Sequence, residues 1–135
     1  MNPYERNENR MEEKMEQEML PSLADASAKD LALACRDILE SKKGANVAVL
    51  SVEGRSDITD YLVLATGTSG PHVKALADEL EYKLSLRDVH PLHADGVGTR
   101  SWQIVDYGIV MVHIFDRESR EFFNLDKLYK ETTEE

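Results

Sequence analysis

Histidine and cysteine side chains are the first candidates for chemistry in this sequence, because they bind metals and act as bases or nucleophiles near neutral pH. His90 and His93 have a spacing that could place both on one metal ion. Pro91 lies between them and no cysteine is close by, which argues against a metal site. Cys35 is the only cysteine and falls on the apolar stripe of a predicted helix. We therefore expect it to pack in a core rather than to act as a nucleophile.

A glycine-rich turn is the second candidate. Gly67-Thr68-Ser69-Gly70 follows a predicted strand and precedes a predicted helix that begins near Pro71. Backbone N–H groups at such a turn can hold an anion. The turn lacks the Lys-Ser/Thr pair of a nucleotide P-loop and does not match the dinucleotide-binding fingerprint. We expect a turn that backbone geometry requires, with phosphate binding as the alternative.

The remaining titratable residues do not form a catalytic arrangement. Asp57 and Asp60 are three residues apart, which places them on opposite faces of an extended segment and makes them a poor metal pair. His113 lies inside the segment VMVHIF, which predicts a hydrogen-bonded histidine in the core or on a sheet face. His72 lies in the first turn of a helix, where the helix dipole favours neutral imidazole. The sequence therefore predicts neither an enzyme nor a cofactor or metal site.

The segment WQIVDYG, residues 102–108, is the best candidate for a binding surface. It holds the only tryptophan, Trp102, and places Asp106 beside Tyr107 near the tip of a hairpin. Large aromatic side chains are enriched at protein interfaces because they bury much area at a low entropy cost. The alternative is that Trp102 fills the core and that Asp106-Tyr107-Gly108 only turns the chain. If Tyr107 lies at the tip, we expect it to have few neighbours in the core.

Helix and strand patterns alternate through the first half of the chain. Ser27 followed by Asp30 predicts a capped helix start, and Gly44 predicts the helix stop. The apolar stripe of this helix comprises Leu31, Ala34, Cys35, Ile38 and Leu39. Strands are predicted at residues 46–52 and 60–66, and the continuous apolar run of the second predicts a strand that is covered on both faces.

The second half predicts another helix and more strands. The buried face of the helix after Pro71 comprises Val73, Leu76, Ala77, Leu80 and Leu84. A short strand is expected around Leu92, followed by a mobile loop over residues 95–98. Strands over residues 101–106 and 109–115 are joined by Tyr107-Gly108 in a tight hairpin. A final helical turn would pack Phe122, Leu125, Leu128 and Tyr129 on the sheet. The fold class is therefore α/β, a mixed β-sheet with flanking helices.

The ends of the chain differ from this folded part. Residues 1–24 are polar and rich in methionine and lack a convincing apolar stripe, which predicts a flexible acidic arm. We expect the domain to span residues 25–130 and a short tail to cover residues 131–135. The N-terminal segment has no apolar centre typical of a secretory signal and no apolar run long enough to span a bilayer, and the lone cysteine suits a reducing compartment. A cytoplasmic protein without a membrane partner is expected.

The charge of the chain restricts its partners. The formal net charge is −10, so DNA or RNA would be repelled on average, because affinity for nucleic acids comes largely from Lys and Arg. An acidic surface instead suits a basic protein partner and speeds encounter with it. The alternative is that acidity only keeps the protein in solution.

Four segments resemble the ribosomal silencing factor family, also called the Iojap-like family, in the order that the family has them. They are DITDYLVLATGTSGPHVKALAD (residues 57–78), WQIVDYG (102–108), VMVHIF (110–115) and REFFNLDKLY (120–129). The resemblance covers roughly residues 27–130. It implies a nucleotidyltransferase-like mixed α/β fold without the catalytic carboxylates. It also implies a monomer or homodimer that binds large-subunit ribosomal protein fourteen, blocks the joining of the ribosomal subunits and represses translation when nutrients are scarce.

The resemblance also indicates which residues contact the partner. By position these are Trp102, Asp106, Tyr107, Gly108, Asp60, Tyr61, Ser69 and His72. Three positions depart from the usual pattern: Pro71 replaces a basic residue before the histidine, Asp95 replaces a Glu, and Ile109 replaces an Asp after the hairpin glycine. The last departure removes an acidic group from the expected contact edge. The rival hypothesis is a nucleotidyltransferase-like enzyme that holds a nucleotide at the turn from Thr66 to Ser69.

Overall fold

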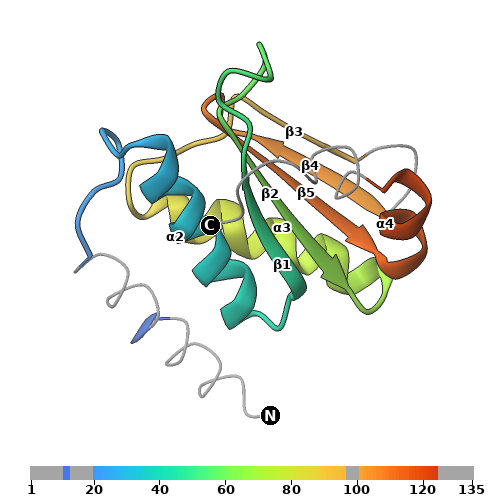
Figure 1. Cartoon of the computed structure of the whole chain (residues 1–135). Coiled ribbons are helices and arrows are strands. Elements are labelled where there is room, and N and C mark those ends of the chain that lie inside the picture. Colours follow the sequence, from blue (N-terminus) through green and yellow to red (C-terminus); the bar gives the residue numbers. More distant parts are fainter. Residues whose placement is uncertain (1–10, 13–19, 97–100, 125–135) are drawn as a thin grey trace.

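The computed structural model describes residues 11–12, 20–96 and 101–124 (Figure 1). One β-sheet forms the centre of the molecule, and α-helices lie against it. The helices are α2 (Ala28–Ser41), α3 (Gly70–Ser85) and α4 (Arg117–Phe123). The strands are β1 (Ala45–Ser51), β2 (Tyr61–Gly67), β3 (His93–Gly96), β4 (Trp102–Asp106) and β5 (Val110–Asp116).

The sheet is mixed, as the sequence predicts. The strand order is β1-β2-β5-β4-β3, and only the central pair, β2 and β5, is parallel. The pairs β1–β2, β4–β5 and β3–β4 are antiparallel. The prediction of an α/β fold with flanking helices is therefore confirmed.

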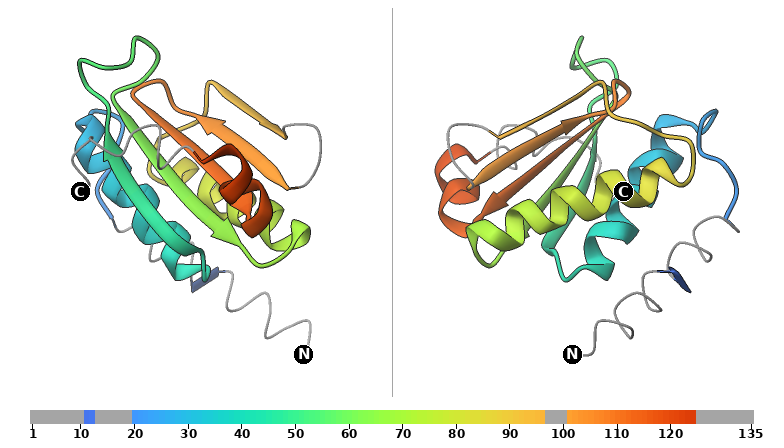
Figure 2. Two further views of the ribbon diagram at one scale, coloured as in Figure 1. Left: turned by 45° about the vertical axis from the view of Figure 1, so that its right-hand side comes forward. Right: turned by 180° about the vertical axis from the view of Figure 1, so that it is seen from behind.

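Strand β2 is covered on both faces, as its continuous apolar run predicts. All seven of its residues are buried. Figure 2 shows α2 and α3 on one face of the sheet and α4 on the other. We call these the α2–α3 face and the α4 face. Successive side chains of a strand point to opposite faces, so β2 supplies Val63 and Ala65 to the core under α2 and α3, and Leu62 and Leu64 to the cluster on the α4 face.

Helix α2 begins as predicted and ends at Ser41, three residues before the predicted stop at Gly44. The hydroxyl of Ser27 accepts a hydrogen bond from the backbone N–H of Asp30 at 3.1 Å, which caps the first turn. At the other end Lys43, not Gly44, takes the left-handed conformation, with φ of 67°. Gly44 is needed for a different reason: a Cβ there would lie 2.8 Å from the Leu39 carbonyl oxygen. Ala32 is buried on the helix stripe, where the sequence predicts Ala34.

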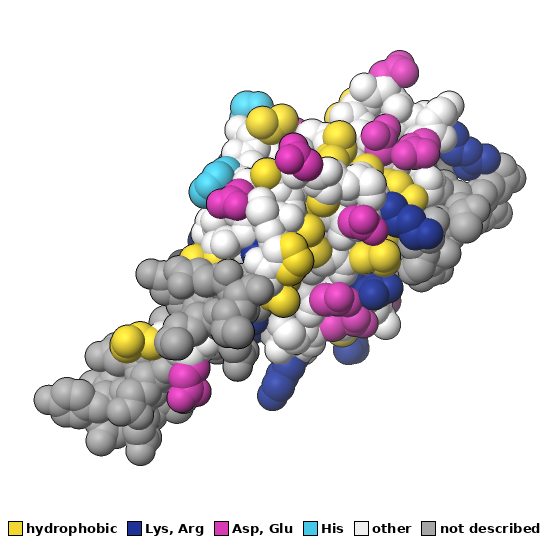
Figure 3. Space-filling view, turned by 90° about the vertical axis from the view of Figure 1, so that its left-hand side faces the viewer, with side chains coloured by type: hydrophobic (Ala, Val, Ile, Leu, Met, Phe, Trp, Pro, Cys, Tyr) yellow, Lys and Arg dark blue, Asp and Glu magenta, His cyan; other side chains and the backbone are white. Residues whose placement is uncertain are grey.

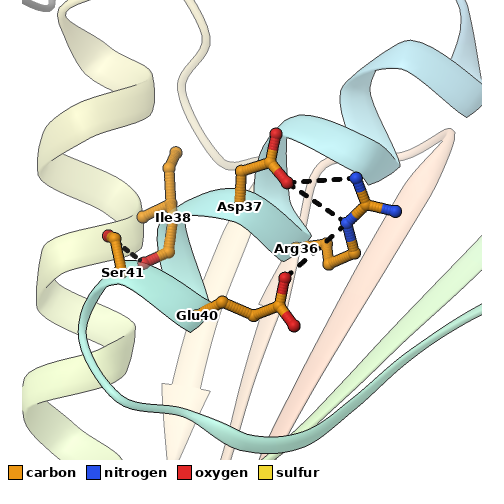
Figure 4. A network of polar contacts seen from close by, with 5 residues as sticks. All are labelled: Arg36, Asp37, Ile38, Glu40 and Ser41. Atoms are coloured by element: carbon orange, nitrogen blue, oxygen red, sulfur yellow. Dashed lines mark hydrogen bonds and ion pairs between the residues drawn. The ribbon is translucent and has the colours of Figure 1, made fainter.

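The exposed side of α2 carries a small ionic network. Arg36 donates a hydrogen bond to Asp37 at 3.1 Å, and its Nε lies 3.8 Å from a Glu40 carboxylate oxygen (Figure 4). The Ser41 hydroxyl donates to the Ile38 carbonyl and tightens the last turn. These groups belong to a solvated helix surface, where such pairs contribute little stability.

Helix α3 confirms its predicted buried face. Val73, Leu76, Ala77, Leu80 and Leu84 are all buried. Glu79 is also buried, and its carboxylate lies 3.5 Å from the ammonium group of Lys83, one turn later. The ion pair provides the buried carboxylate with a charged partner.

The second half of the sheet differs from expectation in one segment. Asp95 and Gly96, predicted in a mobile loop, are the end of strand β3 and pair with Ile104 and Gln103 of β4. The hairpin between β4 and β5 forms as predicted, and Gly108 has φ of 86°. Residues 125, 128 and 129 of the expected final turn lie outside the described residues. Helix α4, which precedes them, contacts β5 and β2.

Residues just before the predicted start of the domain, residue 25, contact the domain. The N–H of Leu23 donates to the Arg87 carbonyl at 2.9 Å, and the Arg87 guanidinium donates to the Pro21 carbonyl at 3.0 Å. The Leu23 side chain packs against the core under α2 and α3. Residues from Pro21 onward are thus attached to the domain. None of the helices in the described part of the chain has the length and apolar character that crossing a bilayer requires.

Candidate protein-interaction site

The predicted contact residues separate into two groups at opposite ends of the sheet. The register of the parallel pair aligns Tyr61 with Val110 at one end and Gly67 with Asp116 at the other, about 20 Å away. We call the first the hairpin end, because the β4–β5 hairpin lies there. It holds Asp60, Tyr61, Asp106, Tyr107 and Gly108, whereas Trp102, Ser69 and His72 lie toward the other end.

Trp102 packs on the sheet and is also partly accessible to solvent. It begins β4 on the α4 face, and its ring stacks on Phe115 with a centroid distance of 5.2 Å. Its indole N–H donates to Nδ1 of His113 at 3.2 Å. The side chain is nevertheless only partly buried. One side of the indole therefore packs on the sheet and the rest is accessible, and a role of Trp102 in binding a partner stays a prediction.

His113 is a structural histidine on the sheet face, as predicted. It is 7% exposed. Because Nδ1 accepts the indole N–H, the ring hydrogen of the neutral form lies on Nε2. Burial lowers the pKa of His113 to about 4. The ring is thus neutral at physiological pH and keeps Nδ1 available as the acceptor that orients Trp102.

Tyr107 is more buried than the sequence predicts. The sequence suggests a hairpin-tip residue with few neighbours in the core, but the side chain is 8% exposed and belongs to the core under α2 and α3. Val105 and Tyr107 point to the same face of the sheet, because they are two residues apart in an extended segment. Burial, followed by the nearby Cys35 and Glu81, raises the pKa of Tyr107 above its usual range. Its hydroxyl has no hydrogen-bond partner among the described residues.

The other residues of the hairpin end have mixed roles. Tyr61 is 6% exposed and also faces α2 and α3, so neither tyrosine offers a side chain to a partner. Asp60 and Asp106 are partly exposed. The carboxylate of Asp106 accepts a hydrogen bond from the N–H of Gly108 at 2.8 Å and thereby stabilises the turn. Its second oxygen leaves a negative charge at this edge of the sheet.

Ser69 and His72 hold the turn between β2 and α3. The Ser69 hydroxyl accepts from the His72 N–H at 3.2 Å and caps the helix. Nδ1 of His72 accepts from the Thr68 N–H at 2.9 Å, and Nε2 donates to the Lys42 carbonyl at 3.1 Å, which links α3 to the end of α2. Two N–H groups of the turn are thus occupied within the protein. These two N–H groups are not available to a phosphate, which argues against the alternative of phosphate binding at this turn.

Of the other candidates for chemistry, Cys35 is structural. Cys35 is fully buried in the core, and burial raises the pKa of its thiol to about 12, which fits the predicted packing role. His93 pairs with Asp106 across β3 and β4. No group of three or more metal-ligating side chains forms among the residues that the structure describes.

Sequence reasoning missed the apolar side chains at the hairpin end. Ile58 is 74% exposed, Leu92 67% and Ile109 40%. In the sequence, Ile109 stands out only as the loss of an acidic group at the start of a predicted strand, and Leu92 only as part of a short strand. Ile58 stands in a loop between polar residues, where burial is not expected, and this is the signal that could have identified it.

Comparison with known families decides the relationship of the chain. The family described as "Ribosomal silencing factor during starvation" matches residues 25–135. This match covers the whole sheet and α2, α3 and α4. The chain belongs to the ribosomal silencing factor family. The resemblance inferred from four sequence segments is therefore confirmed.

Individual relatives support the same family. A Haemophilus influenzae protein named ribosomal silencing factor is 36% identical over 93 residues, which cover 69% of this chain and 91% of the relative. A Bacillus subtilis protein of the same name is 32% identical, covering 73% of this chain and 80% of the relative. The crystal structure of a Chromobacterium violaceum protein matches with a TM-score of 0.73 and 26% identity, covering 77% of this chain and 87% of that one. The names indicate ribosome-associated regulation of translation rather than enzymatic activity.

Proposed function

We propose that this protein binds ribosomal protein fourteen of the large subunit and blocks association of the small subunit, which represses translation when nutrients are scarce. Membership of the ribosomal silencing factor family is the observation on which the proposal depends. The mechanism requires no chemistry, because a folded domain on the docking surface of the large subunit excludes the small subunit sterically. An interface of about 800 Å² per partner is enough for specific binding.

The charge and the α4 face support this proposal. A net charge of −10 suits a basic ribosomal protein. Acidic side chains also occur beyond the α4 face: on the side toward α2, which Figure 3 shows, they lie among Lys, Arg and hydrophobic side chains. Trp102 and Asp106 lie on the same face of β4, about 13 Å apart, within the width of a standard interface. We propose these two residues, together with Asp60, as contacts. Ser69 and His72 are proposed as peripheral contacts, and a cytoplasmic location follows from the proposed target.

The test is co-sedimentation of the purified protein with separated ribosomal subunits. We expect recovery with large subunits and not with small ones. Trp102→Ala should weaken binding to large subunits by roughly 30-fold, the loss expected of an aromatic residue central to an interface. Trp102→Phe keeps the stacking on Phe115 and serves as the conservative variant. Arg36→Ala, on the exposed side of α2, is the control and should bind normally.

Two results would contradict the proposal. Equal recovery with both subunits, or with neither, would refute binding to the large subunit. Normal binding by a folded Trp102→Ala protein would exclude Trp102 from the contact surface. Melting curves of every variant are needed, because Trp102 also packs on the sheet.

A further inference from the structure

A groove runs along α2 on the α2–α3 face of the molecule. Its volume is about 530 Å³, and residues of α2 and of the end of α3 form its sides. The apolar residues that line it are Leu20, Leu23, Leu33, Ala34 and Ile38. Leu20 is 43% exposed, and Leu33 and Ala34 are only half-buried, so the apolar lining is accessible to a further segment of protein. We call this feature the α2–α3 groove.

The chain reaches the folded domain at one end of this groove. Leu20 lines the groove, and a hydrogen bond from the Leu23 N–H to the Arg87 carbonyl at 2.9 Å holds the next residues at the end of α3. Residues 11–12 are helical, and residues 13–19, which lie outside the described part of the chain, connect them to Leu20. The residues before Leu20 therefore have the shortest path into the groove.

Residues 11–19, which we call the methionine segment, contain a methionine at every fourth position, 11, 15 and 19. On a helix these form one narrow apolar stripe about 12 Å long. The groove lining on α2 extends from Asp30 to Ser41, which is about 17 Å of helix. A stripe this narrow does not stabilise a helix in water, which is why the sequence alone predicts a flexible arm. Against the groove the same methionines have apolar surface to cover, and their flexible side chains adapt to it.

The two sides of the groove carry opposite charges. Asp30 and Asp37 lie on the α2 side, and Lys83 and Arg87 lie on the α3 side. Lys83 also pairs with Glu79 at 3.5 Å, but its ammonium group has further N–H donors for a second carboxylate. A helix that fits the groove should therefore carry acidic groups on the flank toward α3 and a basic group on the flank toward α2.

The methionine segment has this arrangement of charges. On a helix, Glu12 and Glu16 lie on one flank of the stripe, and Lys14 and Glu18 lie on the other. When docked, the segment would run antiparallel to α2, because only a short connection separates Leu20 from the start of α2. Since α2 contacts β1 and α3 contacts β4, a right-handed helix in this direction turns Glu12 and Glu16 toward α3 and Lys14 toward α2. Three of the four charges then face groups of opposite charge.

We infer that the methionine segment docks as a helix in the α2–α3 groove of its own chain, with Met15 and Met19 against Leu33 and Ala34. The own segment is favoured over that of a second copy, because a short covalent connection gives it an effective concentration on the order of millimolar. The groove lies on the face of the sheet opposite to that of Trp102 (Figure 2), so the docked segment leaves the proposed ribosome contact free. Docking of the segment therefore does not depend on binding to the ribosome.

Methyl NMR of the full chain tests the contact directly. With methionine, leucine, alanine and isoleucine methyl groups labelled, we expect nuclear Overhauser cross-peaks from Met15 or Met19 to Leu33, Ala34 or Ile38. Absence of all these cross-peaks would overturn the inference. Cross-peaks that occur only between chains, in a mixture of two differently labelled proteins, would assign the groove to a second copy and would also overturn it.

Thermal unfolding of full-chain variants measures what the contact contributes. The double variant Met15→Ser with Met19→Ser should melt about 3–8 °C below the unchanged protein, because it loses the buried methionine surface. The matched control, Glu13→Ser with Gln17→Ser, replaces two residues with the same spacing on the side of the helix away from the stripe. It changes helix propensity to a similar extent and should melt like the unchanged protein. Equal melting temperatures of the double variant and the control would contradict docking, since docked methionines must stabilise the fold.

Discussion

At the scale of single residues, the structure divides the aromatic and imidazole side chains into surface and core in a way that determines which of them a partner can reach. Tyr61 and Tyr107 point toward α2 and α3, whereas Trp102 stays partly accessible on the α4 face. Asp106 contributes through one carboxylate oxygen to the hairpin turn. Fewer of the proposed contact residues are therefore accessible than their positions in the sequence suggest.

Tyr107 provides a direct test of this assignment. Its buried hydroxyl has no partner among the described residues, and an unsatisfied buried hydroxyl costs roughly 1–3 kcal/mol. Tyr107→Phe should therefore be at least as stable as the unchanged protein in urea unfolding. Tyr107→Ala should lose about 3–5 kcal/mol, because it leaves a cavity. If Tyr107→Ala unfolded at the same urea concentration as the unchanged protein, the side chain would not be part of the core.

His113 makes stability depend on pH. Its pKa is about 4 in the folded protein against 6.5 for an unperturbed histidine, so the unfolded chain takes up the proton first as the pH falls. The free energy of unfolding is therefore highest, as far as His113 is concerned, above about pH 6.5. It falls progressively as the pH decreases from 6.5 toward 4, because protonation of His113 stabilises the unfolded chain. The loss is on the order of 3 kcal/mol. Urea unfolding at pH 7.5, 6, 5 and 4.5 measures it.

The matched variant for this prediction is His113→Asn, which keeps a polar side chain but cannot titrate. Carboxylates also titrate in this range, so the informative quantity is the difference between the two proteins. Parallel pH profiles for both would show that His113 does not cause the slope.

At the scale of elements, close approach between β2 and α3 positions the turn that the sequence marks as glycine-rich. A Cβ on Gly67 would lie 2.8 Å from a Val73 methyl carbon and 2.9 Å from the Val73 backbone nitrogen. Only a glycine at this position lets the first turn of α3 pack on the end of the strand. The requirement is steric, since Gly67 does not have the left-handed φ that Gly54 and Gly108 have.

Gly67→Ala should therefore be strongly destabilising, by roughly 2–4 kcal/mol, because backbone atoms must move to admit the methyl group. Gly54→Ala is the control: φ is 78° there, but the space around the position is open. The control should lose only about 1 kcal/mol through backbone strain. Thermal unfolding of both variants compares the two effects, and equal losses would contradict the steric explanation.

At the scale of the whole molecule, the boundary between domain and N-terminal segment affects stability. Pro21 and Leu23 are joined to Arg87, at the end of α3, by two hydrogen bonds, and Leu23 packs on the core. This segment crosses from one helix to the other on the α2–α3 face. A truncation placed at the boundary predicted from sequence would remove it.

Two truncations test the boundary. Deletion of residues 1–19 keeps Pro21 and Leu23, and we take it as the reference. Deletion of residues 1–24 removes a partly buried leucine and both hydrogen bonds, so it should unfold with a free energy lower by about 1–3 kcal/mol. Identical melting of the two proteins would place the boundary back at residue 24.

Much of this protein follows from its sequence alone. The apolar run of β2, the helical stripe that ends at Leu84, and the cap at Ser27 are local patterns, and local patterns persist because each reflects the burial of one face or one backbone group. The order of four characteristic segments also identified the family. Partner identity remains a proposal, since no local pattern contains it.

The tertiary structure determines which side chains of the hairpin are buried and which are exposed. Which face Tyr107 occupies depends on the register of β4 against β5 and on the presence of α3 behind the sheet, and neither is visible in the seven residues of WQIVDYG. Likewise Ile58, Leu92 and Ile109 are far apart in the chain, and only strand pairing and the contact of Leu92 with the hairpin place them together. A surface is a property of packing between distant segments, so the sequence supplies its members and the fold assembles them.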